Sequence, residues 1–306
     1  MKSDVFMTAQ VEHKKNSFFL RSLLWALVAV YTLVLPHVIL IYNAIAKHFS
    51  SEIAGKVSIA LIILLGIAYF LAVLVLKKGI KALALLVPCA IIVWVFISIE
   101  SNPNKYIHIP EYIIMTWLLF EVLALDYKDK GIFVLVFICA ALLGIVDEMM
   151  QGIIPNRHYG WQDMIMNSAA ALMGIFTLAG LRKAPTGDWA WTGGLKEFKP
   201  ALGIMVFGAA GAVLTCVYLF DVKALAFRNV YPFWLLGWNG LFIVTGSVAV
   251  FFQKRLYKPI NPGNDEDSNP YDQAMTARLW ILCPLVILII IHTLVLLTAV
   301  AGLPFN

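Results

Sequence analysis

Charged residues are scarce in this chain. Asp, Glu, Lys and Arg make up 13% of its 306 residues, whereas 61% are hydrophobic and the mean hydropathy is +0.84. A soluble domain carries about 25% charged residues, which cover its core with a polar surface. A soluble globular protein is therefore excluded.

Alternating apolar and polar residues, the pattern of a membrane-spanning strand, are also lacking, so a β-barrel is not expected. The apolar residues instead come in runs near twenty long, the length that an α-helix needs to cross roughly 30 Å of hydrocarbon. We predict an all-α bundle of about nine transmembrane helices at 18–41, 57–76, 82–99, 111–126, 132–150, 164–181, 201–220, 233–252 and 279–300. The first run is too long for a signal peptide and is interpreted as a retained helix.

The four cysteines form no C-x-x-C pair and lie near no pair of histidines. Each falls inside a predicted span: Cys89, Cys139, Cys216 and Cys283. We interpret them as small apolar core residues rather than metal ligands or redox groups.

Lysine and arginine gather in short clusters between the spans and follow no amphipathic face, so nucleic acid is not an expected partner. Cytoplasmic loops of membrane proteins hold an excess of these residues. An amino terminus in the cytoplasm and a carboxyl terminus outside would place 17 of the 23 basic residues in the cytoplasm. The exceptions are Lys47, Lys56, Lys105, Arg157, Lys223 and Arg228.

The order of spans and linkers suggests three parts. We expect an amino-terminal tail with two helices at 1–81, a core of four helices at 82–181, and a carboxyl-terminal extension of three helices at 182–306. Polar linkers at about 182–200 and 253–278 set the last three helices apart from the first six.

Two polar loops, 100–111 and 147–167, both fall on the predicted extracytoplasmic side. In the first, His108 and Glu111 are three residues apart and share a helix face if Pro110 lies in the first turn. The second carries polar residues at helical spacing at both of its ends, so the side chains of the two loops can meet. They are Asp147, Glu148, Gln151, Arg157, Asp163 and Asn167.

Asp163 and Asn167 are one turn apart at the start of the sixth span, where Asp163 is a candidate helix cap. Below them Ala170 and Gly174 form a small-x-x-x-small step. Such steps let helices pack closely, which favours a central place for this helix.

These residues resemble the VanZ-like family. The resemblance rests on an H-x-x-E-Y start to the fourth span, D-E-x-x-Q, Pro155-Asn156-Arg157 and D-x-x-x-N, in this order over roughly 82–181. One departure is Met115-Thr116, where many members have Leu-Gly. The helices before residue 82 and after residue 200 lie outside the resemblance.

The resemblance implies a multi-pass protein of the bacterial cytoplasmic (inner) membrane. The namesake of the family is associated with resistance to the glycopeptide antibiotic teicoplanin. Membrane lipids and a lipid-linked envelope precursor are the expected ligands, bound at the positions that match the family pattern. These are His108, Glu111, Asp147, Glu148, Gln151, Arg157, Asp163 and Asn167.

Several interpretations of the polar cluster stay open. Arg157 could form a purely structural ion pair with Asp147, Glu148 or Asp163, or it could bind a phosphate or carboxylate of a ligand. An enzyme of lipid or envelope chemistry could use His108 as a general acid or base, although the sequence contains no G-x-S-x-G or H-E-x-x-H motif. A metal-dependent version of that enzyme, with an oxygen-rich site made by His108, Glu111, Asp147 and Glu148, is a further alternative. Because only one histidine is well placed, our main interpretation includes no metal and no cofactor. A third interpretation is an accessory subunit of a larger membrane complex.

Overall fold

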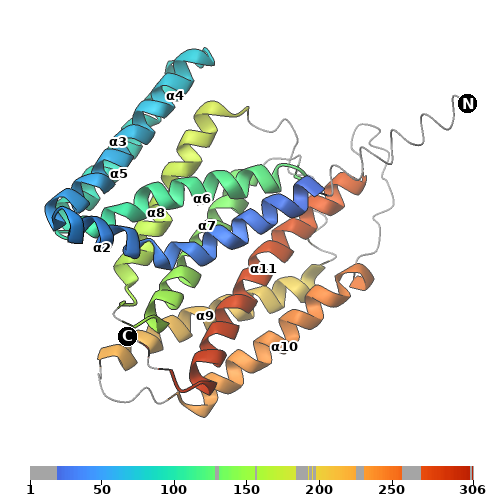
Figure 1. Ribbon diagram of the computed structural model, residues 1–306. Helices are drawn as coiled ribbons and strands as arrows, with labels where there is room; N and C mark the ends of the chain where they lie inside the picture. The colour runs from blue at the N-terminus through green and yellow to red at the C-terminus, as the bar shows by residue number, and fades with distance from the viewer. Residues whose placement is uncertain are drawn as a thin grey trace, which may run out of the picture.

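The computed structural model describes residues 19–127, 131–155, 157–183, 192, 195, 198–224, 231–256, 270–303 and 305. Within these residues the chain forms helices and no strand (Figure 1). Nine helical stretches in this part of the chain are long and apolar enough to cross a membrane. The predicted all-α transmembrane bundle is therefore confirmed. Asn156 of the family motif and most of both polar linkers lie outside the described residues.

The helices follow one another in a simple order. The first apolar stretch is Phe19–His37, and the elements after it are η1 (Leu35–His37), α2 (Ile39–His48), α3 (Ser51–Val75), α4 (Ile80–Ala84), α5 (Leu86–Ile99), η2 (Pro103–Ile107), α6 (His108–Leu123), α7 (Ile132–Ile153), α8 (Trp161–Leu181), α9 (Lys199–Ala224), α10 (Phe233–Leu256) and α11 (Pro270–Val300).

Helix boundaries differ from the prediction near the amino terminus and at α11, which begins at Pro270 rather than 279. The first span ends in the 3-10 turn η1, which carries Pro36 in its first turn. A separate helix, α2, follows, where the prediction ended the first span at 41 and had a loop beyond it. Proline has no N–H to continue an α-helix, which accounts for the break. The second span begins at Ser51 rather than 57, because Ser50 accepts a hydrogen bond from the Ile53 N–H at 3.1 Å and caps it.

The centre of the bundle is α6, with 72% of its apolar window buried, against 17% for α3 and 11% for the α4–α5 span. The small-residue helix that we expected to be central, α8, packs along α6 (Figure 1) and also contacts α3, α4, α5 and α7. The predicted close approach is present, since a Cβ added to Gly174 would lie 2.6 Å from the Thr116 Cβ. Thr116 Oγ1 also donates to the Ala171 carbonyl at 3.4 Å.

Helices α9, α10 and α11 pack together, and α11 joins them to the core by packing on α7 (Figure 1). A buried polar group holds this part together. His292 on α11 places Nδ1 2.6 Å from Asn239 Oδ1 of α10 and Nε2 3.0 Å from the Gly208 carbonyl of α9. One side chain therefore connects all three helices.

Candidate functional site

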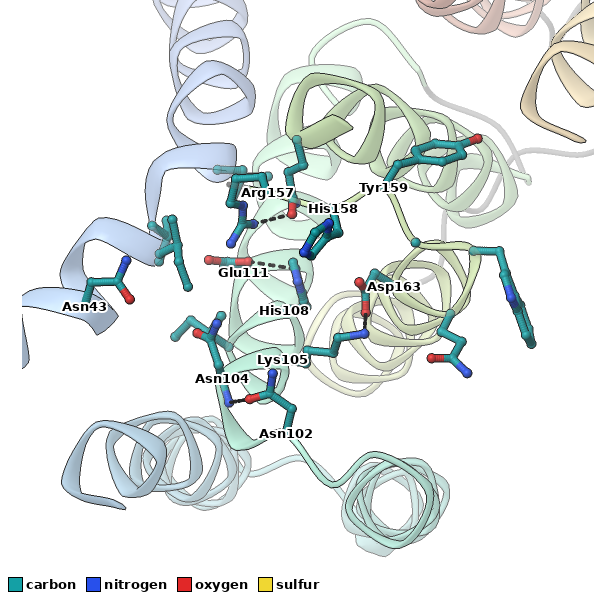
Figure 2. Close-up of a pocket in the computed structure, with 18 of the residues that line it drawn as sticks. Asn43, Asn102, Asn104, Lys105, His108, Glu111, Arg157, His158, Tyr159 and Asp163 are labelled. Atoms are coloured by element: carbon teal, nitrogen blue, oxygen red, sulfur yellow. Dashed lines mark hydrogen bonds and ion pairs between the residues drawn. The ribbon is translucent and has the colours of Figure 1, made fainter. Parts of the chain in front are cut away.

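A cavity of about 740 Å³ lies at the end of the bundle where α6 and α8 begin and α7 ends (Figure 2). The polar residues that the sequence placed in two loops meet there. Five of the predicted residues line it: His108, Glu111, Gln151, Arg157 and Asp163. The others, Asp147, Glu148 and Asn167, are fully buried and are not among its lining residues.

The wall formed by α6 presents His108 and Glu111, as their spacing predicted. His108 Nδ1 lies 3.2 Å from Glu111 Oε2, and both side chains are more than nine-tenths buried (Figure 2). The helix begins at His108, so Pro110 and Glu111 fall in its first turn. Tyr31 of the first helix donates its hydroxyl to the Glu111 carbonyl at 3.0 Å and so fixes this end of α6.

Behind this wall, α7 carries two carboxylates with no exposed surface. Asp147 Oδ2 accepts a hydrogen bond from the Tyr112 hydroxyl at 3.1 Å, and Asp147 Oδ1 has no hydrogen-bond partner among the described residues. Each oxygen of Glu148 accepts one hydrogen bond: Oε1 from Gln151 Nε2 at 3.1 Å and Oε2 from the Gly160 N–H at 3.2 Å. The hydrogen bond to Gly160 ties the end of α7 to the start of α8.

The ion pair at the rim is not the one that the structural interpretation of the cluster expected. Arg157 donates to Gln151 Oε1, and the structure gives it no ion pair with a described carboxylate. Asp163 instead pairs with Lys105 at 2.9 Å (Figure 2), and Lys105 also lies 3.3 Å from Glu100. The reason is position: Lys105 lies on η2 directly opposite the first turn of α8.

Two predictions at α8 need correction or refinement. Asp163 lies in the first turn of the helix, but Gly160 is the cap residue and no side chain caps the helix. Asn167 faces α7, where a Cβ added to Gly144 would lie 3.0 Å from the Asn167 Cβ. Its amide group has no hydrogen-bond partner in the described part of the chain. Asn167 thus lies in the helix contact below the cavity.

Sequence reasoning missed the residues that reach the cavity from outside the 82–181 core. Asn43 and several apolar residues come from η1 and α2, and Phe220 comes from α9. Phe220 packs on Tyr159 at a ring distance of 4.4 Å, and Phe305 packs on the other edge of Tyr159 at 4.9 Å. Burial raises the pKa of the Tyr159 phenol. Two missed residues lie inside that core and close to predicted ones in the sequence: Lys105, three residues before His108, and His158, directly after Arg157.

The side chains that line the cavity could bind charged groups of a ligand, and its titratable groups could donate or accept protons. Its described lining contains no serine, threonine or cysteine, and the hydroxyl present among these residues is the phenol of Tyr159. Lys105, Arg157, His108 and His158 offer donors for anions, and Glu111 and Asp163 offer acceptors. His108, Asp147 and Glu148 have potential metal-ligating atoms within 4.8 Å of one another.

A second cavity, of about 610 Å³, lies beside the core helices. It runs between α3 and α5 on one side and α6 and α8 on the other, and its lining is apolar apart from a few hydroxyl and indole groups. Ile113 and Trp117 of α6 line it, while Glu111 and His108 of the same helix line the polar cavity. One helix therefore borders both a polar and an apolar cavity.

The nine apolar spans and the polar cavity at one end of the bundle define a polytopic α-helical membrane protein. No model of a known protein family matches the chain, and neither a curated protein nor a solved structure matches it. The features of the site itself are therefore the basis for a function.

Proposed function

We propose that this protein binds a lipid or a lipid-linked envelope precursor. The polar head group would lie in the polar cavity of about 740 Å³, and the apolar tail would lie in the second, apolar cavity of about 610 Å³, which we call the groove. The observation that supports this most strongly is that α6 borders both spaces. From Glu111 to Trp117 the helix rises about 9 Å. A ligand with a charged head and a hydrocarbon tail would match a polar cavity and an apolar groove that follow one another along α6.

The head group that suits the cavity best is anionic. The guanidinium of Arg157 makes one hydrogen bond to Gln151, and its Nε has no partner among the described residues. Its planar donor fork suits a phosphate or carboxylate. Glu111 and Asp163 in the same lining would accept hydrogen bonds from amine or sugar hydroxyl groups.

The location proposed for this activity is the outer face of a bacterial cytoplasmic membrane. The lysine and arginine distribution supports this orientation. The resemblance of the cluster to the VanZ-like pattern supports an envelope-related role, including glycopeptide resistance. Both supports come from the sequence, and the cavity adds the chemistry that such a role needs.

The test is lipid binding by the purified full-length protein in native mass spectrometry, with phosphatidylglycerol and phosphatidylcholine as probes. Arg157→Gln should weaken phosphatidylglycerol binding by roughly 10- to 100-fold, since a hydrogen bond to a charged group contributes about 1.5–3 kcal/mol. Arg182→Gln is the matched control, because Arg182 pairs with Glu121 at the other end of α6. Equal loss in both variants would contradict a specific head-group site.

The groove is tested separately by Gly66→Phe. An added Cβ at Gly66 meets no atom within 4 Å, so the larger side chain can enter the groove without a backbone clash. Binding of long-chain phosphatidylglycerol should fall, while binding of its water-soluble head group, glycerol phosphate, should not change. Gly240→Phe on α10 is the control, since Gly240 has open space and is far from the groove lining. A protein partner that stays bound with no lipid would favour the accessory-subunit interpretation.

A further inference from the structure

We propose that His108, Asp147 and Glu148 form a binding site for one divalent transition-metal ion. Each residue offers one ligand atom, and the three atoms lie within 4.8 Å of one another. An ion such as Zn²⁺ binds ligands at about 2.0–2.2 Å, so ligand atoms around one ion are separated by about 3–4 Å. Small rotamer changes would therefore bring the three atoms onto an ion. The site does not depend on the head-group function proposed above.

The charge balance of the cluster is the first argument for an ion. Asp147 and Glu148 have no exposed surface, and Glu111 has 6%. Within the described chain, neither Asp147 nor Glu148 forms an ion pair with a lysine or arginine. Burying a carboxylate without a cation costs several kcal/mol. A divalent cation between them would remove this penalty.

The orientation of His108 is the second argument. Its Nδ1 lies 3.2 Å from Glu111 Oε2, and no hydrogen bond joins Nδ1 to a described residue in this arrangement. A small rotation of the ring or of the Glu111 carboxylate would let a protonated Nδ1 donate to Oε2 and would leave Nε2 with the free lone pair that a metal ion needs. Metal-binding histidines almost always carry such a carboxylate or carbonyl partner on the other nitrogen, which fixes the ring and raises its basicity. Glu111 is thus a positioning residue for a metal-binding His108.

An unused buried oxygen is the third argument. The Tyr112 hydroxyl holds Asp147 Oδ2, whereas Asp147 Oδ1 has no hydrogen-bond partner among the described residues and no exposed surface. Buried polar atoms in native proteins nearly always have a partner, and an exception often marks an ion or a functional role. A metal ion would be that partner.

The donor set determines the class of ion. One imidazole nitrogen and two carboxylate oxygens suit Zn²⁺, Mn²⁺ or Fe²⁺, whereas ions that prefer sulfur lack a thiolate here. Three protein ligands leave coordination positions open. Because His108 also lines the 740 Å³ cavity, these positions would be reached from that side.

The test measures metal binding by the full-length protein in detergent micelles after removal of bound ions with EDTA. Titration with Zn²⁺, and separately with Mn²⁺, should show one ion bound per chain. His108→Gln and the double variant Asp147→Asn, Glu148→Gln should weaken binding at least tenfold. Glu111→Gln should weaken it by roughly 10- to 100-fold through the orientation of His108.

His37→Gln and Glu52→Gln are the controls, because both residues are exposed and lie on other helices. They should bind the ion as the wild type does. Circular dichroism and gel filtration establish that each variant is folded, and the amide substitutions keep the shape of the side chains. Failure of the folded wild type to take up either ion would overturn the proposal, as would undiminished binding in the double variant.

Discussion

Replacing Gly174 with alanine is expected to destabilise the protein, although alanine is the better helix former. An alanine Cβ at this position would lie 2.6 Å from the Cβ of Thr116 and 2.9 Å from both of its terminal atoms. The nearest atom is next to the backbone of α6, so no side-chain rotation removes the clash. The two helices must move apart.

The magnitude follows from two opposing contributions. Glycine to alanine in a helix gains about 0.8–1.0 kcal/mol, and overfilling a packed contact costs about 1–3 kcal/mol. Gly240→Ala on α10 has the gain without the cost, because an added Cβ at Gly240 meets nothing within 4 Å. The difference between the two variants is therefore the steric cost alone, about 1–3 kcal/mol in the free energy of unfolding.

The assay is unfolding by sodium dodecyl sulfate in mixed micelles, followed by circular dichroism for the wild type and both variants. Gly174→Ala should unfold at a lower detergent fraction than Gly240→Ala. A difference of less than about 0.5 kcal/mol, the range of surface substitutions, would refute the close contact between α6 and α8. Contacts other than the one between Gly174 and Thr116 would then have to hold α6 in place beside the polar cavity.

Three further outcomes are expected. A membrane-impermeant maleimide should label Asn104→Cys in intact cells and leave Lys78→Cys unlabelled, and the reverse pattern would overturn the proposed orientation. Lys105→Gln should lower the free energy of unfolding by about 1–2 kcal/mol, because Asp163 loses its 2.9 Å partner in a half-buried setting; an unchanged denaturation curve would show the pair to be irrelevant. Asn239→Leu should cost about 1–3 kcal/mol by leaving a buried histidine nitrogen without its partner, and equal stability to the wild type would contradict the proposed connection of α9, α10 and α11.

The helices themselves were predictable from the sequence because a membrane permits few backbone conformations. Backbone groups in hydrocarbon need internal hydrogen bonds, so an apolar run of twenty residues becomes a helix. The errors occurred where a local feature governs the end of a helix, as with Pro36 at η1 and the Ser50 cap of α3. Hydropathy averages over such single residues.

The polar cluster was predictable in part, for a related reason. Helical spacing places His108 beside Glu111, and the order of the loops brings both near α7 and α8. The partner of Asp163 was not predictable in this way, because Lys105 approaches from a short 3-10 helix whose direction no spacing rule gives. Phe220 was missed for a stronger reason: it reaches the cavity from a helix outside the 82–181 core.

The distribution of charge in the folded cluster strengthens the case for a metal ion, which was only an alternative when judged from the sequence. The cations Lys105 and Arg157 lie at the rim and are bonded to Asp163 and Gln151, whereas the carboxylates of α7 lie deeper with no such partner among the described residues. In the sequence, basic and acidic residues lie close together within the same short loops. In the fold they separate by depth, since the end of α7 is buried and the residues after it return to the rim. A net negative charge is left at the floor of the site, where only a proton or a bound cation can balance it.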